Sequence, residues 1–355
     1  MAGDRLRKLT LFVIALMATV LGGCGAAHGS RLATVCRWFA SPNGADRARG
    51  SAAAPFRSVQ RLVNRLRPGQ TGCLLSGTYP GNVSFYRGGR RRRPITLRSA
   101  PGAHATIEGR IYIARSANHV NVDHLRLDGR NDQDLPSPTV DSAYDQFVDD
   151  DVTNDHSAIC FSLGSGGGYG QAVDALIEHD RIHGCGVLPP TNQEHGIYVA
   201  NSIGARIIDN VIYDNADRGI QLYWNAQRTT IAGNVIDHNG EGIIISGDYG
   251  FASSHNLIID NAITNSTMRA DVESYWPDPA HKGIGNLVVG NCIDGGRLGI
   301  DHDSGGFTAR RNRYVNPLYA DPAVGNYIMR ASSPCASVLA RAAANAASLS
   351  RPSAH

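Results

Sequence analysis

The sequence predicts an all-β fold, a single-stranded right-handed parallel β-helix (a solenoid) that begins with a short capping helix. Three observations lead to this prediction. A Gly-Ile phrase recurs in steps of 23 residues, at positions 196, 219 and 242. A second aliphatic phrase built around an asparagine recurs between these positions. The 40 glycines and only 4 methionines favour many turns over long helices.

The asparagine phrase indicates coils that stack on one another. Each copy contains short strands with period-two alternation, separated by Asn, Gly and Asp corners. One such unit cannot bury its apolar face alone, whereas coils stacked about 4.8 Å apart share a continuous core. We expect about ten coils, with corner asparagines in the left-handed conformation that bond to the coils above and below. The inward stack would contain Ile197, Ile220, Ile243, Val272 and Ile300, and the corner row Asn210, Asn234, Asn261 and Asn291.

The repeat phrasing extends the β-helix domain over residues 35–340. An amphipathic stretch from Pro55 to Leu66 predicts the helix that caps the open end of the first coil. Residues 128–150 are acidic, contain two prolines and lack the repeat phrase, so they are interpreted as an insertion loop. The Ala/Ser-rich tail, residues 341–355, is predicted to be disordered.

Residues 1–24 are typical of an export signal. A positively charged start precedes an apolar core, residues 11–21, which is too short to span a membrane comfortably. The core ends in Leu-Gly-Gly-Cys24, which resembles the bacterial lipoprotein box and predicts lipidation of Cys24 as a membrane anchor. An ordinary signal peptide cut nearby is the alternative, and residues 25–34 would be a linker. Both interpretations export the chain, as a cell-surface or periplasmic lipoprotein or as a secreted protein.

The six remaining cysteines predict a disulfide framework, because exported proteins form disulfides readily. Several connectivities are open, and their order along the fold makes Cys36–Cys73, Cys160–Cys185 and Cys292–Cys335 the economical set. Cys/His spacings typical of zinc sites are absent from the sequence. The net charge of +3 is too small to indicate nucleic acid as a partner.

Short motifs at both ends of the domain carry a family resemblance. Residues 40–44, 55–58, 75–79 and 94–99 look like opening coils, and residues 316–322 look like a closing segment. In these motifs the chain resembles the pectate-lyase-like superfamily of right-handed parallel β-helices, including its chondroitinase-B and alginate-lyase-like members. The resemblance implies the fold and a polysaccharide partner. It leaves the reaction open, since the superfamily holds lyases, hydrolases, epimerases and non-catalytic members.

Alternation along the Gly-Ile strands places aromatic side chains on one outward face. If Ile197 points inward, its neighbours point outward, and the following coils repeat the pattern. Aromatic rings pack on the apolar faces of sugars, so this face is a candidate polysaccharide groove. The expected substrate-binding residues are Tyr198, Gln221, Tyr223, Trp224 and Tyr275.

Acidic side chains follow on the same face. Glu273, Asp301 and Asp303 would lie roughly 5 to 7 Å apart, which suits both retaining and inverting glycosidases. The same three side chains could instead hold Ca²⁺, so the expected cofactor is either none or calcium. His302, between the two aspartates, is predicted to point into the core.

Three basic residues complete the candidate catalytic set. His195 could act as a general base and Arg218 as a clamp for a uronate carboxylate. A charge-paired corner row that keeps the coils in register is the alternative for both. Lys282 could be the proton-abstracting base of a lyase, or a solvated lysine. The arginine run 90–93 would be a solvated turn or a contact for anionic polysaccharide or lipid headgroups.

Together these features predict an exported, monomeric, carbohydrate-active protein. Its activity would be that of a polysaccharide lyase or glycoside hydrolase acting on an acidic polysaccharide. A non-catalytic polysaccharide-binding or cell-envelope scaffold and a C5-epimerase are the alternatives. The acidic cluster favours an enzyme, and the lack of a complete catalytic signature favours the scaffold.

Overall fold

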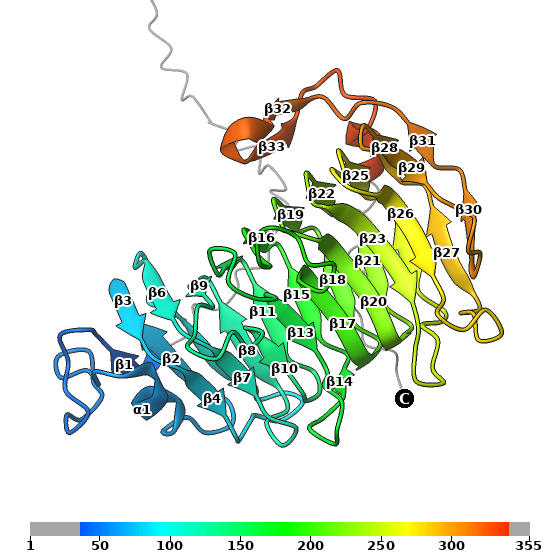
Figure 1. Cartoon of the computed structure of the whole chain (residues 1–355). Coiled ribbons are helices and arrows are strands. Elements are labelled where there is room, and N and C mark those ends of the chain that lie inside the picture. Colours follow the sequence, from blue (N-terminus) through cyan, green and yellow to red (C-terminus); the bar gives the residue numbers. More distant parts are fainter. Residues whose placement is uncertain (1–35, 341–355) are drawn as a thin grey trace, which may run out of the picture. The chain divides into compact units, whose positions relative to one another are not determined.

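A computed structural model describes residues 36–340, which form a right-handed parallel β-helix (Figure 1). The predicted signal peptide with Cys24, the linker 25–34 and the tail 341–355 lie outside the described residues. Within the described part, no helix has the length and apolar character needed to cross a membrane. The predicted fold class is confirmed.

Three parallel sheets run the length of the helix, and successive strands of each sheet come from successive coils (Figure 1). The first sheet consists of β1 (Cys36–Ala40), β2 (Thr71–Leu74), β5 (Ile95–Ser99), β8 (Val120–Asp123), β11 (Gln146–Val148), β15 (Leu176–Glu178), β18 (Arg206–Ile208), β21 (Thr230–Ala232), β24 (Leu257–Ile259), β27 (Asn286–Val289) and β30 (Phe307–Arg310). The second sheet consists of β4 (Val83–Phe85), β7 (Ile111–Ile113), β10 (Thr139–Val140), β13 (Phe161–Leu163), β17 (His195–Ile203), β20 (Arg218–Gln227), β23 (Glu241–Ser246), β26 (Ala270–Tyr275) and β29 (Leu298–Ile300), with β14 (Ala172–Val173) beside β17. The third sheet consists of β3 (Gly77–Pro80), β6 (Ala105–Glu108), β9 (Arg126–Asp128), β12 (Asp151–Thr153), β16 (Arg181–His183), β19 (Val211–Tyr213), β22 (Val235–Asp237), β25 (Ala262–Thr264), β28 (Cys292–Asp294) and β31 (Arg313–Tyr314).

The predicted inward stack forms the core of the second sheet. Ile197 pairs in register with Ile220, and Ile220 with Ile243. Val272 then pairs with Ile243 on one side and Ile300 on the other, although these steps are longer than 23 residues. The first four side chains are fully buried, and Ile300 packs against the same core at its open end. Loops outside the strands therefore absorb the changes in repeat length.

The corner asparagines form a hydrogen-bonded ladder, as predicted. The Oδ1 of Asn234 accepts the backbone N–H and the Nδ2 of Asn210 at 2.9 and 3.0 Å, and its own Nδ2 donates to the Ile207 carbonyl at 2.8 Å. The expected left-handed conformation belongs instead to the residue before each asparagine, such as Asp209 (φ 55°) and Gly233 (φ 70°). The chain turns at that residue, which leaves the asparagine side chain free to point into the corner.

In earlier coils, buried aspartates take comparable corner positions. Asp145 is fully buried, its Oδ1 accepts the N–H of Val120 at 2.8 Å, and its Oδ2 accepts the Ser142 hydroxyl at 2.5 Å. Burial raises the pKa of Asp145 to about 7, although the two hydrogen bonds oppose the shift. This carboxyl group therefore loses protons in the folded state only near neutral pH.

The Asp145→Asn variant is expected to remove a pH-dependent loss of stability. The raised pKa means that the folded state holds the proton more tightly than the unfolded state. Burial of Asp145 therefore does not lower the free energy of unfolding below about pH 4. Its destabilising effect grows as the pH rises toward 7. The difference in unfolding free energy between variant and wild type should grow by up to roughly 4 kcal/mol across this window. Urea unfolding at several pH values measures it, and a difference that does not change with pH contradicts the assignment.

The N-terminal capping helix is present but short. The helix α1 (Val59–Val63) begins after Ser58, whose hydroxyl accepts the N–H of Arg61, and it buries Val59, Leu62 and Val63. The predicted stretch from Pro55 to Leu66 also contains a strand-like entry at Phe56, which bridges to Ala40. That pairing confines the helix to its middle.

The insertion predicted at residues 128–150 is not a loop throughout, because its second half takes part in a coil. β10 pairs with β7 and β13, and β11 pairs with β8 and β15, so the stretch contributes two strands to two sheets. Phe147 is buried in the core. The coil escaped detection because its strands have only two and three residues, too few to show a period.

All three predicted disulfides form. Cys36–Cys73 joins β1 to β2, Cys160–Cys185 closes a corner between coils, and Cys292–Cys335 fastens β28 to the C-terminal segment. A hairpin of β32 (Tyr319–Asp321) and β33 (Asn326–Met329), joined by the short helix η1 (Pro322–Val324), covers the outer side of the third sheet through Tyr213 and Val235. Three disulfides indicate an oxidising compartment, outside the cytoplasm.

Candidate functional site

The outward side chains of β17, β20, β23 and β26, called here the outer face, align as alternation predicts. Tyr198 pairs in register with Gln221, and the same column continues through Ile244 to Glu273. Successive coils are about 4.8 Å apart, so one column presents chemically different groups to an extended ligand. The structure therefore brings the predicted binding residues onto one face.

Aromatic rings are available along this face. The rings of Tyr198 and Tyr223 stack at 6.1 Å, and the Tyr223 hydroxyl donates to Asp248 at 2.9 Å. Burial raises the pKa of both tyrosines, so they remain protonated donors near neutral pH. Trp224 lies half-buried against Phe251 at 5.1 Å, and Tyr275 is 56% exposed. These rings offer apolar surface to sugar rings.

A row of paired charges lies beside the face. The Nε of Arg218 donates to Glu241 at 2.8 Å, and the Nη1 of Arg269 donates to Glu273 at 3.0 Å. Burial and, less strongly, the neighbouring Glu273 raise the pKa of Glu241 to about 8, against the pull of Arg218. Glu241 is thus mostly protonated at neutral pH. Glu273, 9% exposed, is the member of the row that reaches the face.

His195 and Arg218 are closed to substrate, which contradicts their predicted direct roles. They are 2% and 4% exposed, and burial lowers the pKa of His195, so its imidazole is neutral. Arg218 also donates to the backbone and side-chain oxygens of Asn192, whose loop covers it. His195, Arg218 and Glu241 pair in register at this corner, and the Arg218–Glu241 ion pair is charge pairing of the kind that the alternative predicted.

The residues that follow β29 are mostly exposed. Asp301 is half-buried, and its Oδ1 accepts the N–H of Asp303 at 2.9 Å. His302 was predicted to be a core histidine, but it is exposed and stacks on Phe307 at 5.4 Å. The prediction was wrong because β29 ends at Ile300, where alternation stops. Lys282 is exposed, and its Nζ donates to the Ser304 carbonyl at 2.8 Å.

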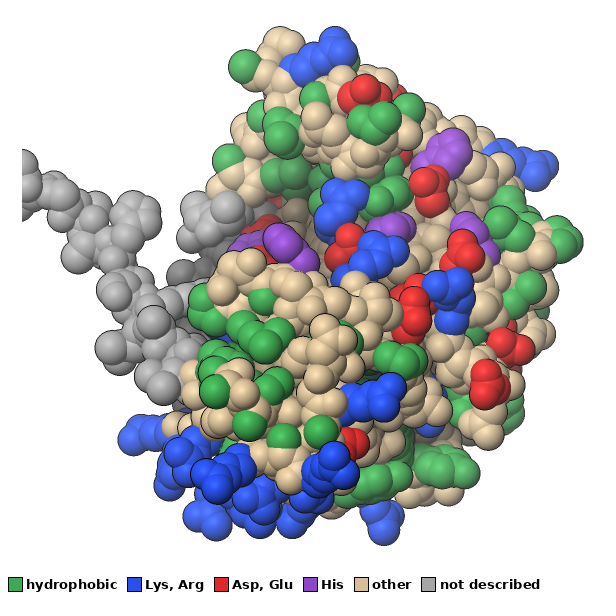
Figure 2. All heavy atoms as spheres, turned by 90° about the vertical axis from the view of Figure 1, so that its left-hand side faces the viewer, with side chains coloured by type: hydrophobic (Ala, Val, Ile, Leu, Met, Phe, Trp, Pro, Cys, Tyr) green, Lys and Arg blue, Asp and Glu red, His purple; other side chains and the backbone are tan. Residues whose placement is uncertain are grey.

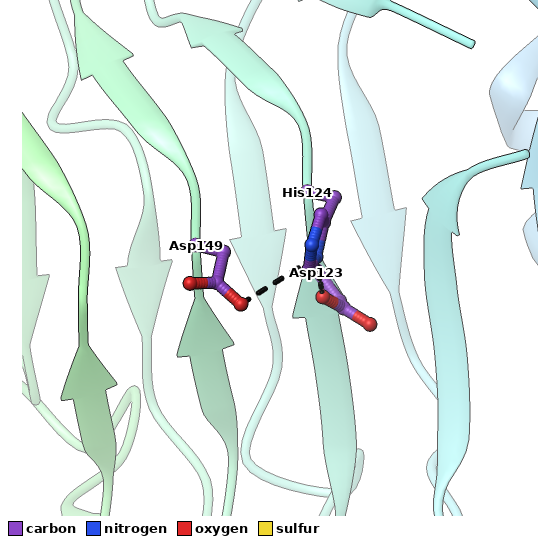
Figure 3. Close-up of side chains that lie close together, drawn as sticks. All are labelled: Asp123, His124 and Asp149. Atoms are coloured by element: carbon purple, nitrogen blue, oxygen red, sulfur yellow. Dashed lines mark hydrogen bonds and ion pairs between the residues drawn. The ribbon is translucent and has the colours of Figure 1, made fainter. Parts of the chain in front are cut away.

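Glu273, Asp301 and Asp303 do not converge as a calcium site would require. Among residues 36–340, the set with three ligand atoms within 4.8 Å of one another is Asp123, His124 and Asp149, on another corner of the helix (Figure 3). Arg269 holds Glu273, and the turn after β29 engages Asp301.

A cavity of about 430 Å³ lies between coils at the loops that follow the second sheet, and sequence reasoning missed it. Its wall includes Arg115, Asp141, Gln171, Asn201 and Trp224. Asp141 is 2% exposed, and burial raises its pKa, although the nearby Ser165, Tyr112 and Arg110 oppose the shift. A guanidinium, amides, a carboxyl group and an indole around one cavity suit a sugar unit. Assigning residues 128–150 to a loop concealed Asp141.

The N-terminal end of the helix is strongly basic. Residues 36–99 contain thirteen arginines and one acidic residue, Asp46, whose carboxylate accepts the N–H groups of Arg57 and Ser58. Figure 2 shows blue side chains gathered at the lower left of this end. The run 90–93 is an exposed turn, and nearby arginines line a cavity of about 670 Å³ that shares Asn118 with the smaller cavity. The basic end is therefore adjacent to the candidate sugar cavity.

Comparisons with known proteins agree on architecture. A family model described as periplasmic copper-binding protein (NosD) matches residues 181–305. The uncharacterized protein YwoF of Bacillus subtilis is 23% identical over 227 residues, which cover 62% of this chain and 46% of YwoF. Pectate lyase PEL9 of Emericella nidulans is 34% identical over 73 residues, which cover 20% of this chain and 18% of PEL9. The chain spans less than half the length of these curated relatives.

The solved structure of pectate lyase Pel9A matches with a TM-score of 0.60 and 12% identity over 84% of this chain and 90% of Pel9A. The chain has the pectate-lyase-like β-helix fold. This confirms the resemblance seen in the end motifs. At such low identity, similarity of fold does not identify the reaction. The function depends on the side chains of the outer face.

Proposed function

We propose that this protein binds an acidic polysaccharide along the outer face and hydrolyses it with the carboxyl groups of Glu273 and Asp301. The observation that carries the proposal is the position of Glu273. Arg269 holds its carboxylate, Glu241 lies close to it, and the side chain still reaches the outward column that begins at Tyr198. A carboxylate that is held in one position can act as a general base or as a nucleophile.

Asp301 supplies the second carboxyl group. Val272 and Ile300 pair in register, so Glu273 and Asp301 follow them on adjacent coils, with backbones about 5 Å apart. Glycosidases use two carboxyl groups about 5 to 9.5 Å apart, one as acid and one as nucleophile or base. Glu241 is a positioning residue in this scheme, because it is buried and acts through Glu273.

The positions of the basic residues favour hydrolysis over elimination. A lyase needs a base that removes the proton next to a uronate carboxyl group. His195 and Arg218 are buried, and Lys282 donates to a backbone carbonyl at the surface. Carboxylates are therefore the groups on the outer face that are suited to proton transfer.

We infer an acidic substrate from the basic N-terminal end of the helix. The guanidinium group of arginine binds carboxylates and sulfates through two parallel hydrogen bonds. The proposal also places the protein outside the cytoplasm, anchored through a lipid on Cys24, and active as a monomer. The disulfides and the polysaccharide-acting pectate lyases among its relatives support the extracytoplasmic part.

A screen of acidic polysaccharides tests the proposed reaction. New reducing ends without new double-bond absorbance are expected, with equal rates in calcium and in chelator. Double-bond absorbance would make the protein a lyase. Saturable binding without any product would make it a polysaccharide-binding scaffold, and a changed uronate composition without cleavage would make it an epimerase.

Replacing Trp224 with alanine is expected to weaken polysaccharide binding about tenfold, because a ring–sugar stack contributes roughly 1 to 2 kcal/mol. Trp224 lines the sugar cavity, while Trp38 lies at the far N-terminal end beneath Arg65. Affinity electrophoresis in polysaccharide gels compares the Trp224→Ala and Trp38→Phe variants. Equal retardation of wild type and Trp224→Ala would remove this cavity from the binding surface.

A further inference from the structure

A row of alternating histidines and aspartates runs along the corner between the first and third sheets. His124, Asp149, His179 and Asp209 each follow the first-sheet strand of successive coils. All four have left-handed backbone conformations, with φ between 55° and 60°. The shared conformation gives the side chains a common direction, so they stack from coil to coil.

Neighbouring groups in this row are spaced too widely for hydrogen bonds. His124 Nδ1 lies 3.7 Å from Asp149 Oδ2, and Asp149 Oδ1 lies 3.8 Å from His179 Nδ1. His179 Nε2 lies 3.9 Å from Asp209 Oδ2. Nitrogen–oxygen hydrogen bonds end near about 3.2 Å, whereas two ligands of a tetrahedral zinc ion sit roughly 3.4 Å apart.

Asp123 adds a third donor at one end of the row (Figure 3). Its Oδ1 contacts the His124 ring, and its other oxygen lies 3.3 Å from Arg98. Ligand atoms of Asp123, His124 and Asp149 all lie within 4.8 Å of one another. Their side chains are 22% to 50% exposed, so an ion can reach them from solvent.

We propose that Asp123, His124 and Asp149 bind a divalent transition-metal ion, with His179 and Asp209 as a second pair in the same row. One imidazole with two carboxylates suits zinc or copper, which take nitrogen and oxygen ligands together. Calcium and magnesium prefer oxygen alone and fit this donor set poorly. Solvent completes the coordination, because the corner is open.

The site is separate from the outer face. It lies between the first and third sheets, while the proposed polysaccharide site uses the second sheet. A cavity of about 690 Å³ lined by His104, His124, His179 and Asp149 adjoins it. Metal binding here is therefore independent of the reaction proposed above, and either can fail alone.

Titration calorimetry of the full chain with Zn²⁺ or Cu²⁺ alone tests the site. His124→Asn and Asp149→Asn should each lower the affinity at least tenfold, since each removes one of three protein ligands. Asparagine tolerates positive φ, so the fold is kept. His255→Asn is the matched control, because His255 is also an exposed corner histidine with positive φ (59°). Its affinity should equal that of wild type.

The visible absorption of bound Co²⁺ is a second measurement. It reports directly on the metal ligands and does not depend on folding alone. Wild type should show visible bands of a cobalt ion bound by nitrogen and oxygen, and His124→Asn should lose them. If a second cobalt ion binds per chain and this binding is lost in His179→Asn, the second site is formed by His179 and Asp209. The proposal is overturned if wild type shows no saturable binding, or if His255→Asn loses as much affinity as His124→Asn.

Discussion

The Asn234→Ala variant is expected to lower the free energy of unfolding by about 3 to 5 kcal/mol. Asn234 is fully buried, and its Oδ1 accepts two hydrogen bonds from Asn210. Its Nδ2 donates to Ile207 and Asn261. Alanine leaves these donors and acceptors buried without partners, and each such group costs roughly 1 to 3 kcal/mol. The loss spreads across three coils, because the ladder joins them.

Asn225→Ala is the matched control. Asn225 lies in β20 of the same part of the helix, is half-buried, and donates to Asn201 at 3.2 Å on the outside. Water can replace that bond, so we expect a loss below about 1 kcal/mol. Urea unfolding followed by circular dichroism measures both variants. Similar small losses in the two would mean that the ladder follows from the coil geometry and does not stabilise it.

Glu273→Gln is expected to reduce kcat at least about a hundredfold while leaving the fold intact. The amide keeps the size of the side chain and its contact with Arg269, but it cannot accept a proton or attack a sugar. Asp132→Asn, in an exposed turn, is the control and should keep full activity. Full turnover by Glu273→Gln would reject the carboxylate mechanism, whatever the substrate.

The Glu241→Gln variant tests whether Glu241 positions Glu273 or takes part in the reaction itself. Glu241 is buried, and its pKa of about 8 depends on burial and on Glu273. Glutamine keeps the size of the side chain and can still accept the bond from Arg218, but it removes the titrating proton. We expect kcat to fall less than in Glu273→Gln and the alkaline limb of the pH profile to shift. An unchanged pH profile would show that Glu241 does not act through Glu273.

The repeating part of the fold was predictable because its signals are local. Ile197, Ile220 and Ile243 share one phrase, so alternation and stacking follow from the sequence directly. The asparagine ladder follows for the same reason, since positions that repeat in sequence meet in adjacent coils. Only the short coil around Phe147 escaped, because two-residue strands carry no measurable period.

The tertiary structure decided which polar side chains can act. His195 and Arg218 stand at the corner that enters the outer face, yet both are buried, and the loop carrying Asn192 covers Arg218. Asp141 became part of a cavity only when the Gly-rich loop that follows β13 closed over it. The sequence determined the register of the coils, since register depends on neighbouring residues. Exposure was decided by loops of variable length, which pack against coils that are distant in the sequence.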